Sequence, residues 1–384
     1  MLSDLGIEYR LLLACALAPP EIDLTTAFAR APELSWKRLL EIAATNKLRP
    51  QLAAHAPVLQ IALSANRGRG LFMAGELVRV LDSLRTQNIV AVPYKGPVFT
   101  TLLGDELGSR EMADLDVLVR PADVVRAATA LAPLGYTISV PPHALASPWL
   151  MRVTSELPIY GPSDSTLLEL HWEASPHWYP APCTVEDVMG HLTEKTFFGC
   201  PIHWPAPEEL FLLHVADGLK SCGRGIRWIA DVVKILRRHT DLDWDRIRNV
   251  AARNGGLNSI RAALASIDGI TGDIARDLDI PALAVTLPAP ARTLADKARR
   301  VAHLARTVQS IRVGLQFDNE TASAIAHFRW ALALADRPMR TAGAIIRYLS
   351  GPTITDVAAM PPQGESDAEL RLRAFRRRLR GLLR

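Results

Sequence analysis

The sequence lacks several features that would assign it to a familiar class. Its four cysteines, Cys15, Cys183, Cys200 and Cys222, are scattered, and no two of them have the CxxC spacing of a zinc or redox site. Scattered cysteines are typical of free thiols in a reducing compartment rather than of a disulfide framework. We therefore expect a cytoplasmic protein without structural disulfides.

Long apolar runs and common nucleotide-binding motifs are also missing. No apolar run reaches the ~18 residues that a membrane span needs, and the run LLLACALA near the start is too short. There is no GxxxxGK[ST] phosphate loop, no kinase-type series of HxD and DFG, and no helical HxxxH pair. These absences argue against a transmembrane protein, a P-loop enzyme, a kinase and a histidine-based zinc site.

A large excess of positive charge is absent from most of the chain. The net charge is +4, and residues 365–384 alone carry seven arginines against three acids, so that residues 1–364 hold 37 bases and 37 acids. A neutral body lacks the extended basic surface that duplex nucleic acid requires, so we do not expect nucleic acid as a partner. The basic tail forms an amphipathic helix with Leu370, Phe375, Leu379 and Leu382 among its apolar positions, which would either pack on the body or touch an anionic surface or partner.

The chain has the composition of a globular protein, with 49% hydrophobic and 22% charged residues over 384 positions. Apolar residues at three- and four-residue spacing predict helices before residue 88 and again from 208 to about 350. Short apolar runs between these regions predict strands near 89–94, 114–119, 137–140 and 165–175. The fold class is therefore α+β, a small mixed sheet flanked by helical regions, with expected boundaries at 1–88, 89–205, 206–350 and 351–384.

Two acids interrupt an otherwise apolar strand in the segment DLDVLV. Asp114 and Asp116 are two residues apart, so they share one face of the strand, and each destabilises the ionised form of the other. A third acid, Glu169, lies on the second strand candidate, LLELHW. Three carboxylates from neighbouring strands are the oxygen ligands that Mg²⁺ prefers, and a pair of such ions stabilises both oxygens of a phosphoryl displacement. The alternative is a strand end whose acids are solvated or paired with Arg110 or Arg120.

Positive residues that could hold phosphates flank these acids. Lys95 and Gly96 follow the first strand candidate, where glycine lets backbone amides approach a triphosphate and lysine adds a charge. Arg110 lies four residues before Asp114 and could reach the same phosphates.

The series YKGPVFTTLLG, SREMADLDVLVRPADVV and LLELHW resembles the nucleotidyltransferase superfamily with the DNA polymerase beta type of fold, and more narrowly a bacterial group within it. The later segment HVADGLKSCGRGIRWIAD resembles that group as well. The resemblance implies transfer of a nucleoside monophosphate from an NTP, with ATP the expected one, and two Mg²⁺ ions. Asp114 and Asp116 would bind metal, and Glu169 would bind the second metal or deprotonate the acceptor. The sequence departs from the family in having Pro97 where a serine often contacts phosphate.

Each of the other polar residues allows two interpretations of its role. His171 shares a face with Glu169, so it is either a base or acceptor contact, or a strand histidine bonded to the backbone. His214, Asp217 and Lys220 lie on one side of a helix, where they line the nucleotide cleft or form an internal salt bridge. The segment HWEASPHWYPAPC is either an aromatic acceptor-binding loop or a packed cover.

These observations predict a cytoplasmic Mg²⁺-dependent nucleotidyltransferase in a biosynthetic tailoring role. Its acceptor would be a hydroxyl or phosphate of a small molecule, a sugar phosphate, or a peptide or protein. The expected nucleotide and phosphate contacts are six residues: Lys95, Gly96, Arg110, His171, His214 and Lys220. Two alternatives remain open: a nucleotide-binding or interaction module without turnover, and a toxin-like enzyme that modifies tRNA.

Overall fold

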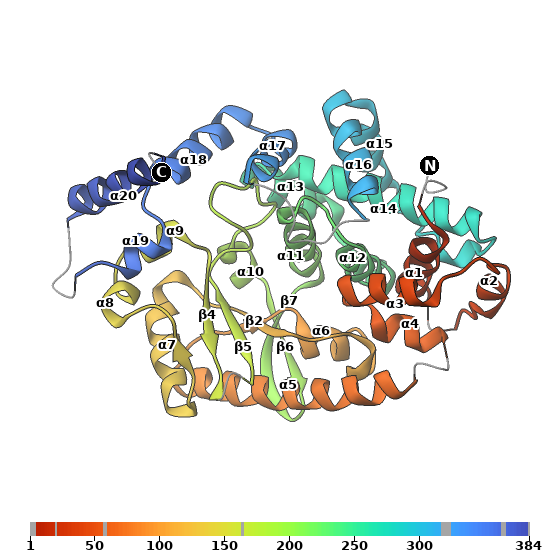
Figure 1. Cartoon of the computed structure of the whole chain (residues 1–384), viewed down its shortest axis with the longest axis horizontal. Helices are drawn as coiled ribbons and strands as arrows, with labels where there is room; N and C mark the ends of the chain where they lie inside the picture. The colour runs from red at the N-terminus through yellow and green to blue at the C-terminus, as the bar shows by residue number, and fades with distance from the viewer. Residues whose placement is uncertain are drawn as a thin grey trace.

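The structure is a computed structural model that describes residues 5–19, 21–56, 60–162, 165–315, 324–361 and 366–382. A small mixed sheet lies between helices that precede it and helices that follow it in the chain (Figure 1). The predicted α+β class is confirmed. The boundaries proposed between parts of the chain stay a prediction, because a single continuous cluster of buried side chains runs through all of them.

The N-terminal region is helical, as predicted. Its helices are α1 (Ile7–Leu17), α2 (Thr25–Ala29), α3 (Trp36–Thr45), α4 (Arg49–His55) and α5 (Gln60–Thr86). Ser35 caps α3 by accepting a hydrogen bond from the Arg38 amide, which satisfies one of the free N–H groups of the first turn. The long helix α5 runs along the lower edge of the molecule in Figure 1 and contacts α4, α6 (Gly96–Leu102) and α7 (Val124–Leu131).

The central sheet has the strand order β1-β2-β5-β4-β3. Its strands are β1 (Val92–Pro93), β2 (Asp114–Leu118), β3 (Thr137–Ile138), β4 (Glu156–Tyr160) and β5 (Leu167–His171). Only the central pair, β2 and β5, is parallel; the other pairs are antiparallel. A separate hairpin follows, formed by β6 (Leu192–Phe197) and β7 (Cys200–Pro205).

The four predicted strands are present, but β4 and the hairpin were not predicted. β4 carries Pro158, which has no N–H for a strand ladder and therefore argues against a strand between two others. In β6, four of the six residues are exposed, so its sequence lacks the alternation of a half-buried strand. Three short helices complete this part of the chain: α8 (Pro142–Leu145), α9 (Leu150–Val153) and α10 (Val185–Met189).

The remainder is helical, as predicted. The helices are α11 (Pro207–Lys220), α12 (Arg227–Arg238), α13 (Trp244–Asn254), α14 (Leu257–Asp277), α15 (Ala289–Arg300), α16 (Ala302–Gly314), α17 (Ala324–Leu334), α18 (Pro338–Ser350), α19 (Ile354–Ala358) and α20 (Asp367–Leu382). The basic tail thus forms the helix α20. Leu370 is fully buried, Phe375 is exposed, and Arg377 pairs with the buried Asp356, so the tail packs on the body at least through its first half.

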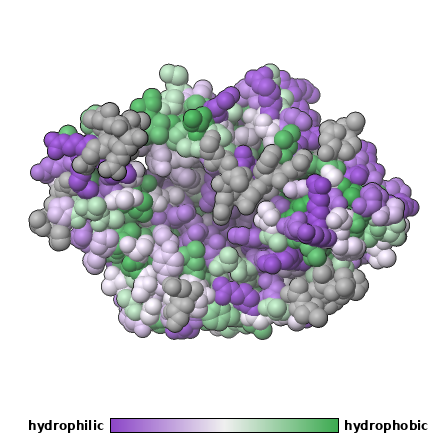
Figure 2. Space-filling view, in the orientation of Figure 1, coloured by the Kyte–Doolittle hydropathy of each residue, from purple (hydrophilic) through white to green (hydrophobic). Residues whose placement is uncertain are grey.

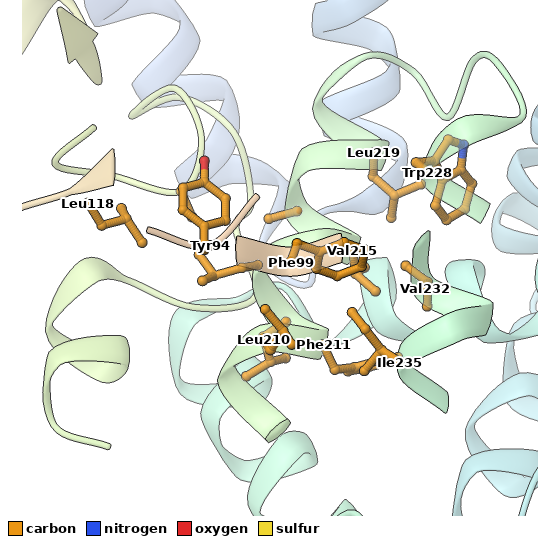
Figure 3. Close-up of a cluster of buried hydrophobic side chains, with 14 of the residues drawn as sticks. Tyr94, Phe99, Leu118, Leu210, Phe211, Val215, Leu219, Trp228, Val232 and Ile235 are labelled. Atoms are coloured by element: carbon orange, nitrogen blue, oxygen red, sulfur yellow. The ribbon is translucent and has the colours of Figure 1, made fainter. Parts of the chain in front are cut away.

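Helix α11 is buried on almost every side because it lies between the sheet region and the later helices. Figure 3 shows Tyr94 and Phe99 on one side of it and Trp228, Val232 and Ile235 of α12 on the other. Helices α13 and α14 also contact α11. This packing holds two polar residues near the end of α11, Asp217 and Lys220, close to the strands β2 and β5 that carry the acids.

Candidate active site

The parallel pairing of β2 with β5 brings two of the predicted acids together. Asp116 lies opposite Glu169 in the register, and Leu118 lies opposite His171. Because side chains alternate along a strand, Asp114 and Asp116 share one face, while Leu115 and Val117 are buried on the other. The sheet therefore presents acids from two neighbouring strands on one surface.

Asp116, Glu169 and His171 form a close group in which one ligand atom from each residue lies within 4.8 Å of the others. His171 Nε2 is 3.3 Å from Asp116 Oδ1 and 3.5 Å from Glu169 Oε2, and its other nitrogen is 3.3 Å from Glu156 Oε2. Nε2 is fully buried and makes no well-aligned hydrogen bond. Two carboxylates and a buried imidazole nitrogen fit a divalent cation, so His171 joins the candidate ligands, and Asp114 as a metal ligand stays a prediction.

The acids and cations of the site shift one another's pKa values. Burial alone lowers the pKa of His171, but the carboxylates of Asp116, Glu156 and Glu169 outweigh burial and raise that pKa to about 10. Burial raises the pKa of Asp114, and the neighbouring Asp116 raises it further, while Lys95 lowers it. Asp116 thus destabilises the ionised form of Asp114, as the sequence suggested.

The salt-bridge partner of the acids is Lys95. Its Nζ donates to Asp116 Oδ1 at 2.9 Å and to Asp217 Oδ1 at 2.8 Å. Burial alone would raise the pKa of Asp116, but Lys95 and His171 hold it well below the usual range. Lys220 also pairs with Asp217, at 3.0 Å, which confirms the internal salt bridge predicted for that helix face.

Neither arginine proposed as a partner of the acids pairs with them. Arg120 lies 3.6 Å from Glu186, and Arg110 forms a buried pair with Asp231 of α12 at 2.7 Å. The two-pronged contact of Arg110 instead ties the loop before β2 to α12. As a phosphate contact, Arg110 stays a prediction.

Arg227, the first residue of α12, was not among the site residues expected from the sequence. Its guanidinium donates to the Glu111 carbonyl at 2.8 Å, and no ion pair with a carboxylate is found for it in the described part of the chain. Burial and the nearby Arg110 lower its pKa to about 10, while Asp231 and Asp114 act in the opposite direction. The segment RWIAD therefore places the cation of Arg227 close to the acids. In the sequence, only the resemblance of this segment to the family pointed to it.

Gly96 has a φ of +61°, the left-handed conformation that glycine adopts without strain, at the start of α6. A Cβ at this position would lie 3.7 Å from the Asp114 carbonyl, an ordinary contact distance. The glycine is thus required by backbone conformation rather than by lack of space. It turns the chain directly after Lys95, so that the lysine points at the acids.

His214 lies apart from the charged group. It is buried, its Nε2 is 3.2 Å from the Tyr94 carbonyl, and its ring lies 4.3 Å from that of Phe99. Burial lowers its pKa to about 4, so the ring is neutral near pH 7. The structure places it behind β1 as a support, and its predicted contact with nucleotide stays a prediction.

Of the comparisons with known proteins, one finds a family and the others find no match. No curated protein and no solved structure matches the chain significantly. No helix within the described residues is long and apolar enough to cross a membrane. A family model described as an uncharacterised nucleotidyltransferase matches residues 32–268, which is more than half of the chain and includes the acids, Lys95 and α11. The chain belongs to this family of uncharacterised nucleotidyltransferases.

Proposed function

We propose that the protein transfers a nucleoside monophosphate from a nucleoside triphosphate, ATP first among them, to an acceptor oxygen with the help of Mg²⁺. The observation that carries the proposal is the close group of Asp116, Glu169 and His171 with Asp114 beside it. Asp114, Asp116 and Glu169 would hold the two expected ions, and His171 is available as a further ligand. The ions would supply charge that stabilises the attacking and leaving oxygens.

The reaction balances with groups that this chain provides. The acceptor oxygen forms a bond to the α-phosphorus, the bond from that phosphorus to the bridging oxygen breaks, and pyrophosphate leaves with the bonding electrons. Where Glu169 does not hold an ion, it would accept the proton of an acceptor hydroxyl; His171 Nε2 lies 3.5 Å from its carboxylate. Arg227 and Lys95 stand beside the acids as contacts for the phosphates.

A second candidate function, binding of nucleotide without turnover, is favoured by one contact. Lys95 already pairs with Asp116, one of the expected metal ligands, through Oδ1 at 2.9 Å. The sequence also lacks the serine that often follows the glycine in the superfamily, since Pro97 stands there. A module of this kind would keep the fold and the nucleotide site and would release no pyrophosphate.

Incubation with each α-³²P-labelled NTP, Mg²⁺ and a cell extract tests the proposal. The isosteric variant Asp114→Asn/Asp116→Asn keeps the side-chain volumes, and we expect it to lose label transfer by at least ~10³-fold, as removal of metal ligands does. The control variant Asp245→Asn/Asp296→Asn changes two acids of exposed salt bridges and should transfer label as the wild type does. Equal transfer by both variants would refute the assigned site. Mg²⁺-dependent NTP binding by the wild type without transfer in any extract would favour the binding module.

A further inference from the structure

A cavity of about 670 Å³ opens beside the candidate active site. Two of its lining residues also belong to the charged network of the site. Glu156 contacts His171 at 3.3 Å, and Lys220 contacts Asp217 at 3.0 Å. The cavity therefore shares a wall with the acids, and a molecule within it would lie next to them. Its volume is that of a small-molecule site.

The cavity is lined by more positive than negative charge. Arg152 of α9, Arg347 of α18 and Arg371 of α20 join Lys220 in its walls. Glu156, the acid in the lining, is already in contact with His171, and Asp367 lies 3.7 Å from Arg152. Arg347 and Arg371 form no ion pair with any carboxylate of the described residues. Figure 2 shows hydrophilic side chains in the middle of the face that includes α18 and α20.

Three aromatic side chains, Trp149, Trp178 and Tyr348, also line the cavity. Trp149 is buried, its Nε1 donates to Asp367 at 2.7 Å, and Arg152 and Arg371 lie 5.1 and 5.0 Å from its ring centre. Trp178 packs edge-on against Phe328 at 5.0 Å and lies 6.0 Å from Tyr348. In the segment HWEASPHWYPAPC, Trp172 and Tyr179 are buried, as expected if this segment packs against the body. Trp178 of the same segment lines the cavity.

We propose that this cavity binds the acceptor, and that the acceptor is a small molecule with a phosphate or carboxylate group and a flat apolar part. Arginines bind oxyanions through paired N–H groups, and aromatic rings stack on planar groups. The inference rests on the proposed function, because it takes the neighbouring acids as the place where the nucleotide reacts. The basic helix α20 then serves as a wall of the acceptor site through Arg371.

The nucleotide is assigned to the cations Lys95 and Arg227 rather than to the cavity. Its phosphates must reach the metal ligands, and the cations beside those ligands are Lys95 and Arg227, which come from the start of α6 and from α12. The arginines of the cavity come from α9, α18 and α20 and form no ion pair with Asp114, Asp116 or Glu169. They anchor an anionic group away from the acids, which leaves the opposite end of the acceptor to approach the α-phosphorus.

Binding of phenyl phosphate, which has both an oxyanion and a ring, tests the proposal. Titration calorimetry and quenching of tryptophan fluorescence measure its Kd. We expect at least tenfold weaker binding by Arg347→Ala/Arg371→Ala and unchanged binding by the control Arg30→Ala/Arg300→Ala, which removes two exposed arginines outside the cavity. Phenol should bind the wild type more weakly than phenyl phosphate. The single variant Arg347→Ala, whose side chain is exposed, should show the same direction of change if the double variant unfolds.

Binding of Mg²⁺-ATP separates this inference from the proposed function. We expect its Kd to differ less than twofold between the wild type and Arg347→Ala/Arg371→Ala. A loss of Mg²⁺-ATP binding by that variant would overturn the inference and make the cavity the nucleotide site. The inference would also be overturned if the wild-type protein bound no phenyl phosphate at millimolar concentration. If the wild type fails to bind Mg²⁺-ATP at all, the proposed function fails, whatever the result with phenyl phosphate.

Discussion

Lys95 links the acids of the sheet to helix α11, so its replacement by methionine tests the site most directly. Its Nζ bridges Asp116 on the sheet and Asp217 on α11, and its side chain is 12% exposed. Methionine keeps an unbranched apolar stem and removes the charge. Two mostly buried carboxylates then lose their common partner.

The structure sets the size of the effect. Removal of one partner from a buried ion pair costs about 3–5 kcal/mol, because the remaining charge is left uncompensated. Each carboxylate keeps a second contact, Asp116 with His171 at 3.3 Å and Asp217 with Lys220 at 3.0 Å. We therefore expect the lower end of the range, a loss of about 3 kcal/mol in the free energy of unfolding when no metal is present.

Mg²⁺ should restore part of this loss, since a cation bound by Asp116 replaces the charge of the lysine. A ligand present at 100 times its Kd stabilises the folded state by about 2.7 kcal/mol. Urea unfolding of Lys95→Met, followed by tryptophan fluorescence with EDTA and with MgCl₂, should show a larger gain from Mg²⁺ than the wild type shows. The control Lys220→Met removes a partly exposed cation with one partner and should cost less than about 1 kcal/mol, with no such gain. Equal losses in EDTA and in MgCl₂ would refute the assignment of Asp116 as a metal ligand.

Two further predictions concern the packing around the site. His214 is buried and its pKa is about 4, below the ordinary 6.5, so stability that is present above pH 6.5 is lost as the pH falls towards 4, by about 3 kcal/mol in total. Urea midpoints measured at several pH values should therefore fall less steeply with falling pH in His214→Phe than in the wild type. An equal slope in both proteins would contradict the burial of a neutral His214. A Cβ at Gly218 of α11 would lie 2.5 Å from the Trp228 ring, so Gly218→Ala should lower the thermal midpoint by several degrees. The matched control Gly75→Ala, in an open helical position of α5, should raise the free energy of unfolding by about 0.5–1 kcal/mol, and similar shifts for both variants would disprove the packing argument.

The parts of the site that follow from strand geometry were predictable from the sequence. Alternation along DLDVLV places Asp114 and Asp116 on one face whatever the rest of the fold does. The apolar positions of the second strand do the same for Glu169 and His171. Their pairing in the structure, with Asp116 opposite Glu169, also depends on the parallel register of β2 and β5, which the sequence did not predict.

The ion pairs of the site were not predictable in the same way. Lys95 is 122 positions from Asp217, and Arg110 is 121 positions from Asp231. Contacts over such separations depend on how α11 and α12 pack against the sheet, and helical periodicity shows which face is apolar but not which polar residue faces which partner. The sequence therefore offered Arg110 and Arg120 as near neighbours of the acids, while the actual partner came from the turn after β1.

The charges around the acids explain how the molecule keeps two aspartates in a buried strand. The network linked by contacts of 3.5 Å or less contains four acids and three cations: Asp116, Glu156, Glu169 and Asp217 with Lys95, Lys220 and His171. Asp114 adds a further acid, so the acids outnumber the three cations of this network. Burial first, and then Asp116, raise the pKa of Asp114, while Lys95 and Arg227 lower it. Divalent cations would remove that excess, whereas the internal lysine and histidine only reduce it. Because of this excess of negative charge next to Asp114, we expect that the contact between Lys95 and Asp116 stabilises the fold when no metal is bound. We expect the same contact to break when a metal ion binds Asp116.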